Sequence, residues 1–346
     1  MSLTLNEIRG QYLALEKTVA LLDEKQAALK AWFSQSRPAS LVFVGCGSSF
    51  SLSKGFCSIA SLRTDIPAYA LAGGDLWLNC EVYRRMLKDA LVISVSRSGE
   101  TSELVNACKA VAALGLGARF LSIVCAEGTP MEALSDFTLC MPWAFDESVC
   151  QTRCVSNLYA MGAMVLGCLF GDPSIREGMA KMAAHGPDYL ARIDARAQAL
   201  AAKDWDHGVV LADGEIDGIA EEAALTFKEI CQQNSNYYHV LDVRHGPMVM
   251  IRKNTLVFVA VKSPACKYEA QLVADLVATG ATVVCYAARG VDIPGALCVP
   301  LEADLGSVAF GLGLVALCQL TTYYKSLVVG CDPDHPDGLD PWIKIN

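Results

Sequence analysis

Short apolar runs alternate with longer amphipathic stretches along most of this chain. Runs of this kind, bounded by turn residues, predict buried strands, and the stretches between them have helical spacing. In the first half the expected strands cover residues 41–44, 68–71, 91–95, 119–124 and 137–141. Strands that alternate with helices are typical of a parallel sheet flanked by helices, so the predicted fold class is α/β.

The strand and turn pattern of the first half repeats in the second. Strands expected at 208–213, 255–261, 281–286 and 296–300 correspond to four of those listed above, at an offset of roughly 160 residues. We interpret the repeat as an internal duplication that produced two domains of one fold. The predicted organisation is a helical segment at 1–36, domains at 37–172 and 207–332, a helical linker at 173–206 and a tail at 333–346.

Apolar positions at helical spacing over residues 4–34 predict one amphipathic helix, or two, that packs on the domains or in a dimer interface. The alanine-rich, charged stretch at 174–206 predicts a long helix that joins the two halves. No stretch near the amino terminus has the apolar core of a signal peptide, and no uninterrupted apolar run has the length of a membrane span.

Composition narrows the classes of function. The 346 residues are 53% hydrophobic and carry a net charge of −9, which argues against a nucleic-acid or anionic-membrane partner. The 15 cysteines are scattered and never spaced as C-x-x-C, so neither a metal site nor a disulfide framework is expected. They indicate small buried side chains in a reducing cytoplasm, and no cofactor is predicted.

Two strand-to-helix turns carry the first candidate chemistry. Gly45-Cys46-Gly47-Ser48-Ser49 follows the strand at 41–44, and Ser96-Arg97-Ser98-Gly99-Glu100-Thr101 follows the strand at 91–95. Glycines let the backbone approach an anion, and free N–H groups and hydroxyls point toward it. Either turn alone is also compatible with a plain structural turn. Both lie at the carboxyl ends of parallel strands, however, so they are expected to converge on one sugar phosphate.

The segments GCGSSFSLSKG and SVSRSGETSEL resemble the two phosphate-binding turns of the sugar isomerase (SIS) domain family, and S-x-S-G-E-T is their most specific part. A third segment, FKEICQQNSNYYHVLDVRHGPMVMI, resembles the isomerase half of glutamine–fructose-6-phosphate amidotransferase and its shorter relatives, the amino-sugar-phosphate deaminases and isomerases and the fructosamine-6-phosphate deglycases. The resemblance implies two SIS domains, each a flavodoxin-like, three-layer αβα unit. It also implies a set of phosphate-binding residues: Ser48, Ser49, Ser96, Arg97, Ser98 and Thr101.

The loop at 143–155 covers the sugar in the proteins that this chain resembles. Glu147, Cys150, Gln151 and Thr152 are therefore candidates for contact with its hydroxyls, together with Gly47. A solvated loop with a helix cap at Thr152 is the alternative. In the second half the corresponding turns are Asp213-Gly214-Glu215-Ile216 and Lys262-Ser263-Pro264, without serine clusters. Because carboxylates repel phosphate, we expect the phosphate in the first domain.

The resemblance assigns catalysis to Glu229 and His245 in the second domain. Glu229 is expected at the end of an apolar helix face, where burial would raise its pKa and suit a proton shuttle. His245 lies in a Gly-Pro turn, and a histidine of near-neutral pKa can open a sugar ring. Without the resemblance, these would be a surface helix carboxylate and a turn histidine.

Two departures bear on the reaction. The amidotransferase has a lysine where this chain has Thr226, and a second one in its tail where this chain has Asp340-Pro341; Lys344 is close but lies in an expected terminal extended segment. We also expect no amino-terminal glutaminase domain and no terminal cysteine nucleophile. We therefore expect not glutamine-dependent synthesis but a metal-independent deglycase or deaminase, or an aldose–ketose isomerase, acting on a 6-phosphorylated amino sugar or ketosamine. The tail at 333–346 is expected over the active site.

Other classes of function stay open. A sugar-phosphate sensor would use the serine turns without chemistry, and an assembly protein would need neither turn. Tandem domains of this family usually pair, and the histidine commonly comes from the neighbouring subunit. The resemblance therefore implies a cytoplasmic homodimer, or a dimer-based oligomer, with shared sites.

Overall fold

The computed structural model describes residues 2–261 and 267–345. Its first sheet contains five parallel strands in the order β2-β1-β3-β4-β5. These strands are β1 (Ser40–Gly45), β2 (Ala68–Ala72), β3 (Ala90–Ser96), β4 (Arg119–Val124) and β5 (Phe137–Cys140). Each bound lies within one residue of the prediction. The apolar runs are strands because both faces of the sheet are covered.

The second sheet has the same arrangement, with strand order β7-β6-β8-β9-β10 and parallel pairing throughout. Its strands are β6 (His207–Leu211), β7 (Asn234–Tyr238), β8 (Thr255–Val261), β9 (Thr282–Ala287) and β10 (Leu297–Pro300). Four of them were predicted. Only β7, which reads NSNYY, was missed, because its polar residues suit an edge strand that is exposed on one side.

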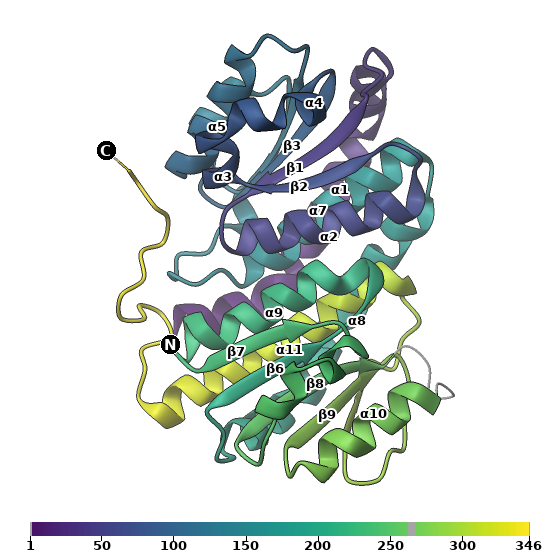
Figure 1. Cartoon of the computed structure of the whole chain (residues 1–346), viewed down its shortest axis with the longest axis vertical. Helices are drawn as coiled ribbons and strands as arrows, with labels where there is room; N and C mark the ends of the chain where they lie inside the picture. The colour runs from purple at the N-terminus through teal and green to yellow at the C-terminus, as the bar shows by residue number, and fades with distance from the viewer. Residues whose placement is uncertain (1, 262–266, 346) are drawn as a thin grey trace.

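A layer of helices lies between the two sheets (Figure 1). It contains α1 (Leu3–Ser34), α2 (Ser48–Arg63), α7 (Arg153–Phe170), α8 (Pro173–Ala201), α9 (Asp217–Ile230) and α11 (Gly306–Val329). The largest hydrophobic core runs through this layer and draws side chains from both halves, including Tyr12, Tyr159, Tyr189 and Phe227. The two halves therefore share one interior.

Shorter helices cover the outer faces of the sheets. On the first sheet these are α3 (Gly73–Leu78), α4 (Arg84–Leu87), α5 (Ser102–Ala113) and α6 (Pro130–Leu134), and on the second α10 (Lys267–Ala278). Short 3₁₀ turns complete the connections: η1 (Cys80–Tyr83), η2 (Pro142–Ala144), η3 (Gly214–Ile216), η4 (Asp242–Arg244) and η5 (Pro247–Met250).

The two expected long helices are both present, with changes. The N-terminal segment is one helix, α1, not two. The expected linker helix is α8, and it packs along α1 and α11 with buried positions over its whole length. It is therefore part of the shared core rather than a spacer between separate bodies.

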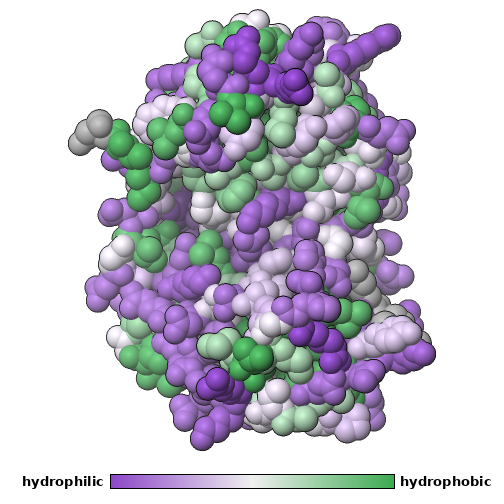
Figure 2. Space-filling view, in the orientation of Figure 1, coloured by the Kyte–Doolittle hydropathy of each residue, from purple (hydrophilic) through white to green (hydrophobic). Residues whose placement is uncertain are grey.

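Two of the described helices, α7 and α11, are long and apolar enough to cross a membrane by length and composition alone. In each, however, most residues are buried inside the protein: 78% of the 18 residues of α7 and 83% of an 18-residue stretch of α11. The core of the fold accounts for their hydrophobicity. On the face in Figure 2, exposed hydrophobic side chains form small separate patches among polar ones.

Candidate functional site

The first serine turn joins β1 to α2. Gly47 occupies the N-cap position of α2 with φ of +54°, a backbone conformation that favours glycine. A Cβ at Gly45 would lie 2.3 Å from the carbonyl oxygen of Ser49, so only glycine fits there. No side chain caps α2 among the described residues. The N–H groups of Ser49, Phe50 and Ser51 donate to the carbonyl oxygens of Cys46 and Gly47, which leaves the Ser48 N–H without a backbone acceptor in the described part of the chain. Such a helix start can hold an anion.

The second serine turn follows β3 and is fixed by its own hydroxyls. The N–H of Gly99 donates to Ser96 Oγ at 2.9 Å, and the N–H of Glu100 donates to Ser98 Oγ at 3.2 Å. Gly99 has φ of +63°, and a Cβ there would lie 2.5 Å from Thr129 Oγ1. The turn is therefore rigid, with its hydroxyls buried beside the first turn.

The two turns meet at a small recess of about 30 Å³. Five of the six predicted phosphate-binding residues line it: Ser49, Ser96, Arg97, Ser98 and Thr101. The sixth, Ser48, lines an adjoining cavity of about 230 Å³, which shares Cys46, Thr101 and Gln151 with the recess. All six side chains are thus gathered at the carboxyl ends of β1 and β3, where ligands of parallel sheets bind.

The larger cavity also contains residues predicted to contact a sugar. Gly47, Cys150 and Gln151 line it, and so does Glu229 from α9 in the second half of the chain. Thr152 does not belong to the described lining of either cavity. The structure therefore brings together two serine turns, two loop residues and one carboxylate from four separate parts of the chain.

The loop before α7 is packed, unlike the solvated alternative considered above. Ser148, Cys150 and Thr152 are buried, whereas Glu147 is exposed. Thr152 stands at the N-cap of α7 but makes no side-chain capping bond. Asp146 Oδ2 accepts the N–H groups of Thr152 and Cys154 instead, at 2.7 and 2.9 Å. Burial and the neighbouring Glu7 charge raise the pKa of Asp146 to about 7.

Arg97 lies at the centre of these contacts. It is 3% exposed, and one NH₂ group donates to the Ser148 carbonyl oxygen at 2.7 Å while the other donates to the Pro341 carbonyl oxygen. Its Nε is buried and has no hydrogen-bond partner among the described residues. No carboxylate forms an ion pair with Arg97 in the described part of the chain. A buried guanidinium without a counter-ion favours the entry of an anion.

Glu229 is partly buried near the end of α9 and faces the larger cavity. Burial raises the pKa of Glu229 from 4.5 to about 7, and the positive charges of Arg97 and Lys228 oppose the rise. Near neutral pH this carboxyl is therefore present in both protonation states. It can accept a proton at one atom of a bound molecule and donate it at another.

A second carboxyl, Glu222, was missed from the sequence. It lies seven residues before Glu229 on the same face of α9 and is fully buried, and neither side-chain oxygen has a hydrogen-bond partner among the described residues. Burial and the Glu229 charge raise the pKa of Glu222 well above the ordinary value. The nearby Ser48 hydroxyl lowers this pKa, but by less than burial raises it. Glu222 is therefore a buried carboxyl with a raised pKa beside the first serine turn. Its position on a face rich in alanine and isoleucine was the available signal.

His245 does not reach this site within one chain. It follows η4, is exposed, and is absent from the described linings of both cavities. Apolar side chains close to it in the sequence are exposed as well: Leu241 at 44%, Val249 at 72% and Met250 at 58%. The structure thus places Glu229 at the cavity and His245 on the surface.

The C-terminal tail lies along the first half of the chain (Figure 1). Residues 339–343 line the larger cavity, and the Ser102 N–H donates to the Ile343 carbonyl oxygen at 3.2 Å. Lys344 Nζ lies 3.0 Å from Glu100 Oε2, an exposed ion pair that does not involve the cavity. The tail therefore covers the serine turns.

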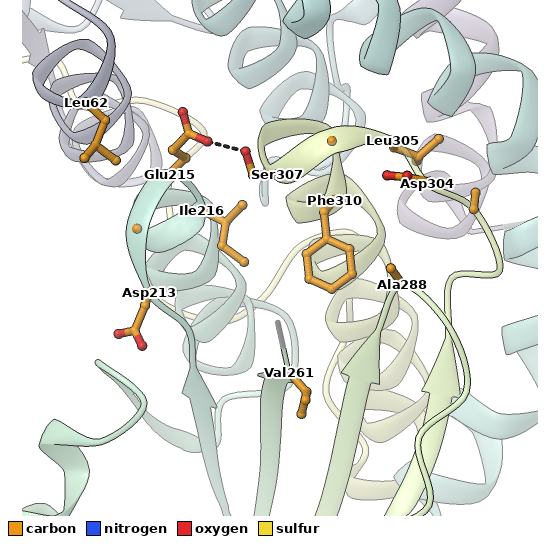
Figure 3. A pocket seen from close by; sticks show the side chains of 13 residues that line it. Leu62, Asp213, Glu215, Ile216, Val261, Ala288, Asp304, Leu305, Ser307 and Phe310 are labelled. Atoms are coloured by element: carbon orange, nitrogen blue, oxygen red, sulfur yellow. Dashed lines mark hydrogen bonds between the residues drawn. The ribbon is translucent and has the colours of Figure 1, made fainter. Parts of the chain in front are cut away.

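The second half contains a cavity of about 450 Å³ beyond the carboxyl ends of β6, β8 and β9. Figure 3 shows Phe310 facing into it, while Glu215 bonds to Ser307 at its edge and Asp213 points away. Glu215 also pairs with Arg63 of α2, at 3.0 Å between its Oε2 and an NH₂ group. Of the two second-half turns discussed above, the one at 213–216 presents carboxylates, and the one at 262–264 lies outside the described residues. Within the described residues no group of three or more metal-binding side chains occurs.

The comparisons with known proteins agree with this geometry. Residues 34–166 match the family model described as SIS domain. This segment of the chain is therefore similar to SIS domains. It contains both serine turns and the loop before α7, which supply most of the lining of the recess. Glu229 and tail residues 339–343 complete the larger cavity from outside this segment.

Among curated proteins, the chain is 26% identical over 277 residues to the glutamine–fructose-6-phosphate aminotransferase (isomerizing) of Clostridium acetobutylicum, an alignment that covers 75% of this chain and 44% of that protein. The chain thus matches less than half of that relative. Two solved structures share the fold. Glucosamine-6-phosphate deaminase from Thermotoga maritima superposes with a TM-score of 0.81 at 24% identity, covering 99% of this chain and 100% of that one. Tagatose-6-phosphate ketose/aldose isomerase from Escherichia coli gives 0.86 at 22% identity, with coverage of 100% and 96%.

Proposed function

We propose that this protein is a metal-independent enzyme that binds a 6-phosphorylated amino sugar or ketosamine and transforms it by acid–base catalysis. The supporting observation is that Glu229 and the two serine turns face connected cavities, and that burial raises the pKa of Glu229 to about 7. The phosphate would occupy the recess beside Ser96 and Ser98, and the sugar would extend toward Glu229 under Gln151. The names of the relatives, all of them proteins that act on sugar phosphates, point the same way.

Within this class, a deglycase or deaminase fits best. The amidotransferase lysines are replaced by Thr226, whose hydroxyl donates to the Ala223 carbonyl oxygen within α9, and by Asp340-Pro341 in the tail. Neither can form a Schiff base with a ketose carbonyl. The nearby Lys344 pairs with Glu100 and does not belong to the described lining of the larger cavity. Glu229 would move a proton between neighbouring sugar carbons, or donate it to the leaving amine nitrogen as the C–N bond breaks. His245 would open the ring or assist water. An aldose–ketose isomerase needs only the first of these steps.

We further propose that the chain contains two SIS domains, at 37–172 and 207–332. The identical strand order of the two sheets supports this, since the family match itself covers only the first. The second domain would supply Glu229 and His245, while the phosphate stays in the first. With 14 cysteines free in the described residues, we place the protein in the cytoplasm.

We also propose a homodimer in which His245 of one copy completes the cavity of the other. The exposed position of His245 and its apolar neighbours supports this arrangement. A mixing experiment tests it. In a mixed dimer of Glu229→Gln and His245→Ala chains, one of the two sites contains both native side chains. Random reassortment of two inactive variants should therefore restore roughly a quarter of wild-type turnover. If both side chains act within one chain, mixing restores nothing.

A sugar-phosphate sensor is the second candidate, because the recess could bind without chemistry. An NMR time course with 6-phosphosugars, their 2-amino forms and fructosamine 6-phosphates separates the two. Conversion of one compound supports the enzyme and identifies its substrate. Line broadening of ligand signals without conversion supports the sensor.

A further inference from the structure

The first two turns of α1 hold both segments that cover the site. One is the loop around Ser148, and the other is the C-terminal tail. Neither attachment follows from local sequence, since the loop lies about 140 residues from its α1 contact and the tail about 330. In both segments a carbonyl oxygen then accepts a hydrogen bond from the same guanidinium, that of Arg97.

Glu7 makes the attachment to the loop. It is 4% exposed, and its Oε1 accepts the N–H groups of Glu147 at 2.6 Å and Ser148 at 3.2 Å. Its Oε2 accepts the Ser148 hydroxyl. A buried carboxylate with several hydrogen bonds fixes the peptide it binds, because each lost bond would leave a buried polar group unpaired. Glu7 thus fixes the Ser148 peptide, whose carbonyl oxygen accepts from Arg97.

Asp334 makes the attachment to the tail. Its Oδ1 accepts the Ser2 hydroxyl at 2.7 Å and the Thr4 N–H at 2.8 Å, and its Oδ2 accepts the Leu3 N–H at 2.9 Å. It therefore caps the N-terminus of α1 from outside the helix. Burial raises the pKa of Asp334, but the hydrogen bonds from Ser2, Thr4 and Leu3 together outweigh it and keep this pKa below its usual value.

The loop and the tail also bind one another. The Asp334 carbonyl oxygen accepts the N–H of Val149 at 3.0 Å, next to the peptide that Glu7 holds. Arg97 is therefore clamped between two carbonyl oxygens whose positions are both set from α1. Its Nε remains unpartnered among the described residues, and the Arg97 side chain lines the recess.

We propose that Glu7 and Asp334 are positioning residues that act through Arg97: they hold the loop and the tail so that the guanidinium presents its free edge to an anionic group of the ligand. α1 is then part of the binding machinery rather than only a packing element. This inference rests on the proposed function, since it takes the ligand to be a sugar phosphate.

The test measures affinity for sorbitol 6-phosphate, an open-chain analogue that cannot react, by calorimetry. Arg97→Lys and Glu7→Ala should each weaken binding about tenfold, the effect of losing one charge-assisted hydrogen bond. Because both act through one guanidinium, the double variant should be no more than about threefold weaker than either single variant. Glu7→Gln keeps one acceptor oxygen and should recover part of the affinity. Glu16→Gln, an exposed carboxylate on the same helix, is the matched control and should change nothing.

Two results would overturn the proposal. One is a double variant whose loss of affinity equals the sum of the two single losses in binding free energy, and the other is a Glu7→Ala protein that is less stable but binds sorbitol 6-phosphate as tightly as wild type. If the wild-type protein binds no phosphosugar, the proposed function fails. Amide hydrogen exchange then still tests whether Glu7 holds the loop and the tail together through Arg97. Glu7→Ala should speed exchange in peptides that span 146–150 and 339–345 together. Faster exchange in the loop alone would contradict a clamp through Arg97.

Discussion

The buried Glu229 carboxyl should make the stability of the protein depend on pH in a defined way. Its pKa rises from 4.5 to about 7 on folding, so the folded state binds the proton more tightly than the unfolded state. The stabilising contribution is therefore complete below pH 4.5 and is lost as the pH rises through 7. Replacement by glutamine, which stays neutral, removes this dependence.

The difference between the folded and unfolded pKa of Glu229 sets the size of this change in unfolding free energy. With about 1.4 kcal/mol per pH unit, the whole difference between 4.5 and about 7 corresponds to about 3 kcal/mol. Most of it, about 2.5 kcal/mol, falls between pH 5 and pH 8.5. Relative to wild type, Glu229→Gln should therefore gain about 2.5 kcal/mol in free energy of unfolding between pH 5 and pH 8.5.

Urea unfolding followed by circular dichroism at both pH values measures this difference. Glu16→Gln, which removes an exposed carboxylate, serves as the control and should follow wild type. An equal difference between Glu229→Gln and wild type at pH 5 and at pH 8.5 would refute the reasoning, because it would mean that Glu229 ionises alike in the folded and unfolded chain.

Three further predictions follow from the same geometry. If protonated Glu229 is the acid, kcat should fall as the pH rises through about 7, and a pH–rate profile that stays flat from 6 to 8 would contradict that role. Ser98→Ala should weaken sorbitol 6-phosphate binding about tenfold in calorimetry, since it removes one hydroxyl donor, and should also lower the melting temperature, since the Glu100 N–H loses its acceptor. Gly99→Ala should cost about 2 kcal/mol or more of unfolding free energy, because φ is +63° and the new Cβ meets Thr129. Gly115→Ala, with φ of +61° and open space around it, should cost only about 1 kcal/mol, and equal losses would contradict the steric argument.

Local pattern was enough to predict the strands and the serine turns. Alternation of apolar runs with helical spacing marks a parallel sheet, and the turns that follow β1 and β3 must then lie at one edge. The gathering of Ser49, Ser96 and Ser98 around one recess is a consequence of that rule. The edge strand β7 was not predicted because most of its residues are polar.

Long-range contacts were beyond that reasoning. Nothing in the sequence near Arg97 indicates that Ser148 and Pro341 bind its guanidinium, or that Glu7 and Asp334 hold both partners from α1. Such links depend on how the tail and the loop fold back over the first half. The two-turn spacing of Glu222 and Glu229, in contrast, was readable from the sequence and needed only the assumption that one buried helix face carries both.

The position of His245 is the remaining case. Sequence and resemblance indicated a catalytic residue, whereas a single chain leaves it exposed on the surface. In the proposed dimer the partners of His245 would come from a second copy, which a single chain does not contain. The pairing of Glu229 with His245 thus stays a prediction that the mixing experiment addresses.

The central claim is that Glu229 performs chemistry on a sugar phosphate held by the serine turns. The most direct measurement compares wild type and Glu229→Gln on the converted sugar phosphate, with turnover followed by NMR and affinity for sorbitol 6-phosphate measured by calorimetry on the same samples. We predict that the variant loses at least about a hundredfold in kcat, as the loss of a general acid–base group implies, and that its affinity stays within about threefold. Undiminished turnover in the variant would contradict the account.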